Sequence, residues 1–126
     1  MQIVRLEFEG IGPCAQRQVI DFEELSIGGL FLLEGPTGAG KSTIVDAMVF
    51  ALYGDVAGSE SSKGRIVSTM LPEGVEPFVD LTIDTSHGLL RVRRVPEYER
   101  VKKRGSGNTT VKASIKLWKL AAPCLL

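Results

Sequence analysis

The sequence contains few of the residues that build disulfide frameworks and metal sites. Its 126 residues include two cysteines, Cys14 and Cys124, and one histidine, His87. The cysteines lack the spacing of metal ligands, and two thiols do not make the framework of a disulfide-rich domain. We interpret both as small hydrophobic side chains of a reduced, cytoplasmic protein. We expect His87 to be an exposed residue of a hairpin turn.

Long apolar segments are also missing. No apolar run in the sequence approaches the ~20 residues that span a bilayer. The first residues do not form a basic region followed by an apolar stretch, so no secretory signal is visible. These absences predict a protein without a membrane partner.

The formal net charge is zero, but the charges are unevenly distributed. Residues 1–60 contain three basic and nine acidic side chains, whereas residues 61–126 contain twelve basic and six acidic ones. Such asymmetry indicates an anionic partner for the second half of the chain. The hydrophobic fraction of 44% is enough for the core of one small domain.

Hydrophobic patterning predicts strands in both halves of the chain and one helix between them. Two-residue alternation predicts strands at residues 4–8, 79–84, 90–93 and 111–117, and residues 19–22 complete a hairpin at a sheet edge. The apolar run 30–33 is typical of a strand covered on both faces. Residues 42–53 predict a helix whose apolar face contains Ile44, Met48, Ala51 and Leu52. We expect residues 55–77 to form a surface connection with at most a short helix around 65–70.

The strongest signal is a glycine-rich segment between the predicted strand and the predicted helix. It matches the phosphate-binding pattern G-x-x-x-x-G-K-[ST] in full. The candidate nucleotide-binding residues are Gly35, Pro36, Thr37, Gly38, Ala39, Gly40, Lys41, Ser42 and Thr43. The flanking elements supply the context that the pattern requires; a glycine-rich turn without a ligand is the alternative interpretation.

Each part of this pattern has a role in holding a triphosphate. Glycines allow successive main-chain N–H groups to converge on phosphate oxygens, and the helix adds the positive end of its dipole. Lys41 is expected to reach the β- and γ-phosphates, and the Ser42 hydroxyl is the candidate Mg²⁺ ligand. Thr43 is expected to cap the helix or to touch the α-phosphate. The expected cofactors are therefore ATP and Mg²⁺.

Residues for hydrolysis are not evident after Lys41. Hydrolysis requires a carboxylate at the end of a second apolar strand and a residue that orients water. The nearest carboxylate is Asp80, but the alternation of residues 79–84 predicts a half-exposed strand, so Asp80 is a weak metal candidate. No glutamine follows Gln18. We identify no catalytic residue and expect weak nucleotide binding, without turnover, by this chain alone.

Residues 29–54 resemble the N-terminal ATPase segment of the SbcC family, which groups with the long coiled-coil ATPases that act with a nuclease on DNA ends. The turn at residues 11–13, the pair Asp21-Phe22, and Asp46, which the wider SMC-like group shares, agree with this resemblance. The similarity extends to about Leu120. It implies an α/β fold: a P-loop NTPase, the N-terminal lobe of an ABC-type ATPase head with an antiparallel β part, here incomplete.

The same resemblance implies a domain organisation and partners. Residues 1–120 would form the N-terminal ATPase lobe, and residues 121–126 would be an atypical C-terminal tail. Family members are far longer, and their coiled coil, signature motif, second carboxylate strand and switch histidine have no counterpart in this sequence, so we expect a truncated product. The implied partners are an SbcD-type nuclease, a second ATPase head and double-stranded DNA ends.

A basic stretch provides a second candidate site. Residues 91–104 contain seven basic and two acidic side chains. The candidate DNA-phosphate contacts are Arg100, Lys102, Lys103 and Arg104. The alternative is a solvated hairpin whose charges keep an edge strand from aggregating.

The function that these signals favour is the ATP-binding N-terminal lobe of the ATPase component of an exonuclease complex that processes DNA double-strand breaks. Two alternatives stay open. One is a small P-loop kinase of a metabolite, although the basic second half of the chain offers neither an acceptor-site base nor a lid. The other is a non-functional remnant.

Overall fold

The computed structural model describes residues 1–25, 34–35, 41–54, 66–102 and 104–120. In this part of the chain, seven strands and two helices follow one another. Their bounds are β1 (Gln2–Glu9), β2 (Gln18–Asp21), α1 (Phe22–Leu25), α2 (Lys41–Tyr53), β3 (Phe78–Thr85), β4 (Gly88–Val95), β5 (Tyr98–Val101), β6 (Asn108–Val111) and β7 (Ser114–Leu120). The predicted strand 30–33 lies outside the described residues.

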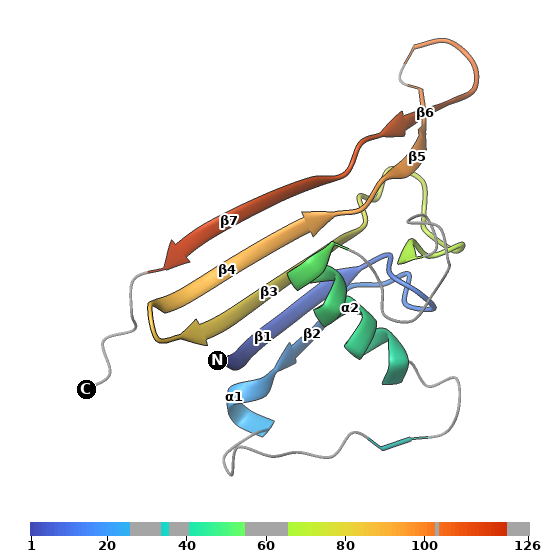
Figure 1. Ribbon diagram of the computed structural model, residues 1–126. Helices are drawn as coiled ribbons and strands as arrows, with labels where there is room; N and C mark the ends of the chain where they lie inside the picture. Colours follow the sequence, from blue (N-terminus) through green and yellow to red (C-terminus); the bar gives the residue numbers. More distant parts are fainter. Residues whose placement is uncertain (26–33, 36–40, 55–65, 103, 121–126) are drawn as a thin grey trace.

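The main structural unit is a five-stranded antiparallel sheet. Its strand order is β2-β1-β3-β4-β7, so β2 and β7 are its edges (Figure 1). The predicted hairpins β1–β2 and β3–β4 are confirmed, and β1 also pairs with β3 along its whole length. A second sheet, the ribbon of β5 and β6, extends from the end of β4 (Figure 1).

Alternation along the strands gives the sheet two chemically different faces. Leu6 lies opposite Leu81 and Phe8 opposite Val79, and all four side chains are buried in one core. Their neighbours point to the other face, because successive side chains of a strand alternate. Glu7 lies opposite Asp80 there, and both carboxylates are buried.

Helix α2 covers the apolar face of the sheet, in contact with β3 and β4 (Figure 1). Ala47, Phe50 and Ala51 are its most buried apolar side chains and belong to the same core as Leu6 and Phe8. The predicted apolar face is therefore rotated by about one residue. The predicted burial of Ala51 is confirmed. Ile44, Met48 and Leu52 are only partly buried, at the margin of the core.

The segment that follows residue 65 is not a surface connection throughout. Ile66 and Ser68 are buried, and residues 66–70 form a bridge and turns rather than a regular α-helix. The Gly12 N–H donates to the Ile66 carbonyl over 2.7 Å, and the Ser68 N–H donates to the Gly10 carbonyl over 2.8 Å. These hydrogen bonds fix the segment to the turn after β1, a pairing that local patterning does not reveal.

Two predicted strands have different bounds in the structure. The extended segment 19–22 ends at Asp21, because Phe22 begins α1. The strand expected at 111–117 is divided: β6 ends at Val111 and β7 begins at Ser114. His87 lies exposed in the β3–β4 turn, as predicted.

No described helix is long and apolar enough to span a membrane.

Candidate functional site: the ends of helix α2 and the basic stretch

The predicted phosphate loop leads directly into α2. Of its residues the structure describes Gly35 and the first turn of α2, and residues 36–40 lie outside the described part. Helix α2 begins at Lys41, one residue before the predicted start, and continues for 13 residues. The first residue after the glycine-rich segment is therefore helical, as the phosphate-binding pattern requires.

The N-terminus of α2 suits an anion. The first four N–H groups of a helix have no partner within it, and the helix dipole places partial positive charge there. The first turn of α2 contains no acidic side chain that would neutralise this charge. Ser42 is exposed in the same turn, so its hydroxyl is accessible to a hydrated metal ion. These residues fit the predicted nucleotide and Mg²⁺.

Thr43 connects the start of α2 to the sheet. Its side chain is 7% exposed and packs against Gly12, which follows β1. Gly12 has a φ of 56°, and a Cβ atom there would lie 3.0 Å from the Thr43 hydroxyl oxygen. The side chain of Thr43 is thus an anchor of the helix. Sequence reasoning identified the turn at residues 10–13 but not this contact.

The C-terminus of α2 is bound by a side chain from β4. Arg94 Nε donates a hydrogen bond of 2.8 Å to the Ala51 carbonyl oxygen. Ala51 is among the last four residues of the helix, whose carbonyls have no partner within it. The helix itself contributes no basic residue in its last turn. Sequence reasoning placed Arg94 in the basic stretch and missed this function.

Two more arginines of the basic stretch bind a buried carboxylate. Arg91 donates to both oxygens of Asp80, with the shortest contact, Nη2 to Oδ2, at 2.6 Å. Arg93 lies 3.6 Å from the same carboxylate and stacks over the ring of Phe78. The hydrogen bonds that Arg91 donates to Asp80 raise the pKa of Arg91 above its usual range, although partial burial opposes this shift. Arg91 also lies over the ring of Trp118.

This arrangement corrects the sequence interpretation of Asp80. The strand 79–84 is not half-exposed at its start, because Phe78 to Leu81 are all buried and Asp80 is only 2% exposed. Both carboxylate oxygens accept hydrogen bonds from Arg91, so the charge of this buried carboxylate is balanced within the fold by an arginine. Within the described residues, no group of three or more His, Cys, Asp and Glu side chains could hold a metal ion.

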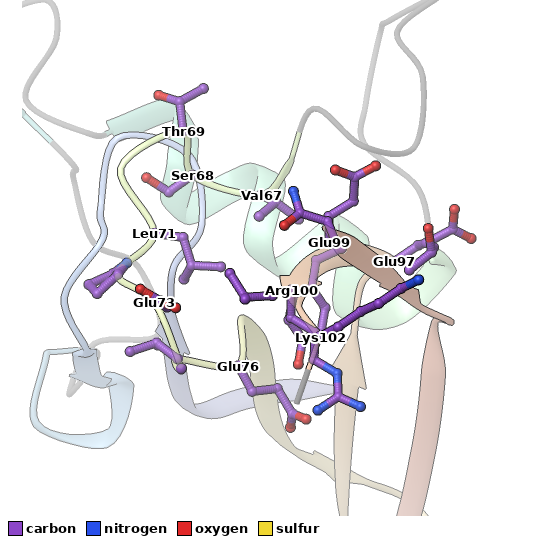
Figure 2. Close-up of a pocket in the computed structure, with 17 residues that line it drawn as sticks. Val67, Ser68, Thr69, Leu71, Glu73, Glu76, Glu97, Glu99, Arg100 and Lys102 are labelled. Atoms are coloured by element: carbon purple, nitrogen blue, oxygen red, sulfur yellow. The ribbon is translucent and has the colours of Figure 1, made fainter. Parts of the chain in front are cut away.

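The other described cations of the basic stretch lie on or beside the β5–β6 ribbon. Arg100, Lys102 and Arg104 are exposed, and Lys103 lies outside the described residues. A cavity of about 1090 Å³ separates the ribbon from the 67–76 segment (Figure 2). Arg100 and Lys102 line it together with four carboxylates, those of Glu73, Glu76, Glu97 and Glu99. The structure therefore brings these two candidate DNA contacts close to acidic side chains.

Comparison with known proteins identifies relatives over most of the chain. A family model described as an AAA domain matches residues 5–122. The C subunit of the SbcCD nuclease of Vibrio cholerae is 37% identical over 110 residues, which cover 86% of this chain and 11% of that protein. The protein of the same name from Lactococcus lactis is 38% identical over 117 residues, covering 93% of this chain and 11% of that protein.

This chain thus spans about 11% of the length of these two relatives. Among solved structures, an SMC head domain from Thermotoga maritima aligns with 88% of this chain and 36% of its own, with 22% identity and a TM-score of 0.45. The family model alone covers more than nine-tenths of the sequence. The chain therefore belongs to the AAA domain family, and both the predicted P-loop fold class and the predicted resemblance to SbcC proteins are confirmed.

Proposed function

We propose that this chain binds ATP with Mg²⁺ through residues 35–43. The observation that carries the proposal is the position of α2, which begins at Lys41 directly after the glycine-rich segment and has no acidic side chain in its first turn. Membership of the AAA domain family implies nucleotide binding.

The roles of the individual residues follow from their chemistry. The donors to the phosphate oxygens would be main-chain N–H groups. They would come from Gly35, from residues 37–40 and from the first turn of α2, since Pro36 has no N–H. The Lys41 ammonium would neutralise charge on the terminal phosphates, and the Ser42 hydroxyl would contribute one oxygen ligand to Mg²⁺. Mg²⁺, when bound, offsets negative charge on the phosphates. Thr43 would hold the helix in place through Gly12 while its main-chain N–H stays available.

The biological setting that we propose is a nuclease complex acting on DNA ends. It is supported by relatives whose names describe a component of the SbcCD nuclease. In this setting the chain would act with an SbcD-type nuclease, a second ATPase head and double-stranded DNA ends, in the cytoplasm. We expect no ATP turnover by this chain alone, because no run of four apolar residues ending in aspartate follows Lys41 in the sequence.

We further propose that Arg100, Lys102, Lys103 and Arg104 contact DNA phosphates. The support is that Arg91, Arg93 and Arg94 have partners within the fold, whereas Arg100, Lys102 and Arg104 are exposed. Neutralising Arg100, Lys102 and Lys103 together should weaken DNA retention and lower the salt dependence of binding by about one unit of slope per lost contact. Neutralising Lys116 and Lys119 of β7 together is the control, and it is compared with neutralising Arg100 and Lys102 as a pair. Unchanged DNA retention at low salt would contradict the assignment.

Thermal melting tests the nucleotide proposal. A ligand that binds only the folded state raises stability, by about 2.7 kcal/mol at a concentration of 100 Kd. We expect Mg-ATP to raise the Tm of the chain and to leave the Tm of Lys41→Ala nearly unchanged. Equal stabilisation of both proteins would contradict the proposal. A parallel assay of ADP formation, with and without candidate acceptor metabolites, separates a binding lobe from a metabolite kinase, which would form ADP as it transfers the γ-phosphoryl group to its acceptor.

A further inference from the structure

Helix α2 is fixed to the sheet at both of its ends. At its start, Thr43 packs against Gly12. At its end, the Arg94 guanidinium binds the Ala51 carbonyl. The two contacts come from different parts of the sheet, the turn after β1 and strand β4, and the proposed phosphate site lies at the first of these ends.

The contact with Arg94 depends on a glycine. Gly54 directly follows α2, has a φ of 77°, and its N–H donates to the Phe50 carbonyl over 2.7 Å. A Cβ atom at Gly54 would lie 2.9 Å from Arg94 Nη1 and 3.3 Å from Cζ. The guanidinium therefore occupies the space that any other residue would fill, and both its position and the turn require glycine.

The geometry points to Arg94 as a positioning residue for the nucleotide site. We infer that its guanidinium fixes α2 along the helix axis and thereby sets where the N-terminal N–H groups meet the phosphates; this inference rests on the proposed nucleotide binding. Arg94 lies opposite Val79 in the β3–β4 register, on the sheet face that α2 covers. Arg91 and Arg93 of the same strand instead form ion pairs with Asp80 on the opposite face of the sheet.

Electrostatics explains why a cation is suited to this place. A helix carries partial negative charge at its C-terminus, where a positive side chain is stabilising. Because α2 has no basic residue in its last turn, β4 supplies that charge. A charged donor also binds a carbonyl more strongly than a neutral one. Removing Arg94 should therefore loosen the last turn and let the helix shift relative to β3 and β4.

The test compares Arg94→Met with Arg93→Met in the full chain. Each variant removes one guanidinium from β4, but only Arg94 touches α2. Two measurements are made at a temperature where circular dichroism shows each variant folded: hydrogen exchange of the α2 amides without nucleotide, and the Kd of a fluorescent ATP analogue with Mg²⁺. We expect Arg94→Met to speed exchange in α2 and to weaken nucleotide binding about five- to tenfold, and Arg93→Met to change the Kd less than about twofold.

The outcomes separate this inference from the proposal on which it rests. The positioning function would be overturned if α2 amides of Arg94→Met exchanged at the wild-type rate or if this variant had the wild-type Kd. It would also be overturned if Arg93→Met lost as much nucleotide affinity as Arg94→Met. Binding that Lys41→Ala leaves unchanged would instead overturn the nucleotide proposal. If Arg94→Met does not fold, the nucleotide affinities of Arg94→Lys and Arg94→Gln provide the test. The affinity order wild type, lysine, glutamine supports the inference, and equality of glutamine with wild type overturns it.

Discussion

The buried carboxylates of the sheet show how single residues of this chain are stabilised. Glu7 binds Arg5 and Arg17, and Asp80 binds Arg91 and Arg93, all on the sheet face opposite α2. Each carboxylate is nearly inaccessible, whereas its arginine partners remain partly exposed. A buried charge is tolerated only when it is paired. The arginines therefore also cover the carboxylates.

Substitution of Asp80 tests this pairing. Asp80→Asn removes the charge that both arginines bind and should lower the free energy of unfolding by about 2 kcal/mol. Urea unfolding provides the measurement. Asp84→Asn, at an exposed position of the same strand, is the control and should change stability by less than about 0.5 kcal/mol. Similar losses in the two variants would show that the buried pair has no special role.

The pH dependence of the Asp80–Arg91 pair follows from the direction of the arginine shift. Because the pKa of Arg91 is raised in the folded chain, its protonated guanidinium contributes stability in full below the usual arginine pKa. On the alkaline side, that contribution is lost only as the pH rises through the raised value. A double-mutant cycle should therefore give the same coupling free energy at about pH 7 and about pH 10. A coupling that halves over this interval would contradict the assignment.

At the residue scale, sequence reasoning identified the phosphate-binding pattern because its residues are contiguous. It did not identify the Gly12–Thr43 contact or the Gly54–Arg94 contact, since each joins residues that are far apart in the chain. It also predicted that residues 79–84 form a half-exposed strand, because alternation alone does not reveal that arginines cover Asp80.

At the scale of elements, the C-terminal turn of α2 is constrained by a contact between Gly54 and Arg94. Four glycines of the chain with similar positive φ differ in their surroundings: Gly54 contacts Arg94, whereas Gly74, Gly105 and Gly107 have nothing within 4 Å of a Cβ position. The comparison separates the cost of the backbone conformation from the cost of the collision with the guanidinium.

A pair of alanine variants measures that difference. Gly74→Ala should destabilise the chain by about 1 kcal/mol, the cost of a left-handed backbone at a non-glycine residue. Gly54→Ala should lose at least about 1 kcal/mol more, because its methyl group also displaces Arg94. Both values are measured by thermal unfolding. Equal losses would show that the guanidinium moves aside without penalty.

Strand β7 is an edge strand that exposes apolar side chains. It pairs with β4, and no other described strand pairs with it (Figure 1). Ile115 and Leu117 are 53% and 66% exposed, and Trp118 is 38% exposed. An exposed edge with apolar side chains is a template for association between chains, which charged residues such as Lys116 and Lys119 oppose.

Substitution at β7 tests this liability. Leu117→Glu should reduce self-association of the chain at high concentration, as sedimentation velocity would show, while the free energy of unfolding changes by less than about 0.5 kcal/mol. Thr110→Glu adds the same charge to β6 and should leave self-association unchanged. Association that is insensitive to Leu117→Glu would place the contact elsewhere.

Sequence patterning predicted the local elements better than their pairing. Helix α2 and the hairpins β1–β2 and β3–β4 follow from periodicity and turn residues that are close in sequence. The pairing of β1 with β3, and of β4 with β7, joins segments separated by long connections, and no local signal specifies it. The ribbon of β5 and β6 is too short for alternation to distinguish it from a loop.

For the whole molecule, the fold distributes the charge of the basic second half between two functions. Arg91, Arg93 and Arg94 stabilise the sheet and α2, while Arg100, Lys102 and Arg104 are exposed on or beside the β5–β6 ribbon. The net charge of the segment is therefore larger than the positive charge that an anionic partner can contact. The chain spans about 11% of the two relatives described above, and the sheet with α2 forms its core.

The most direct test of the account is equilibrium titration of the chain with a fluorescent ATP analogue, with and without Mg²⁺. We expect saturable binding that Mg²⁺ strengthens, that excess ATP displaces and AMP does not, and that Lys41→Ala weakens at least about tenfold through the lost ammonium–phosphate contact. A Kd that is the same for wild type and Lys41→Ala, or equal displacement by AMP and ATP, would contradict a triphosphate site at the start of α2.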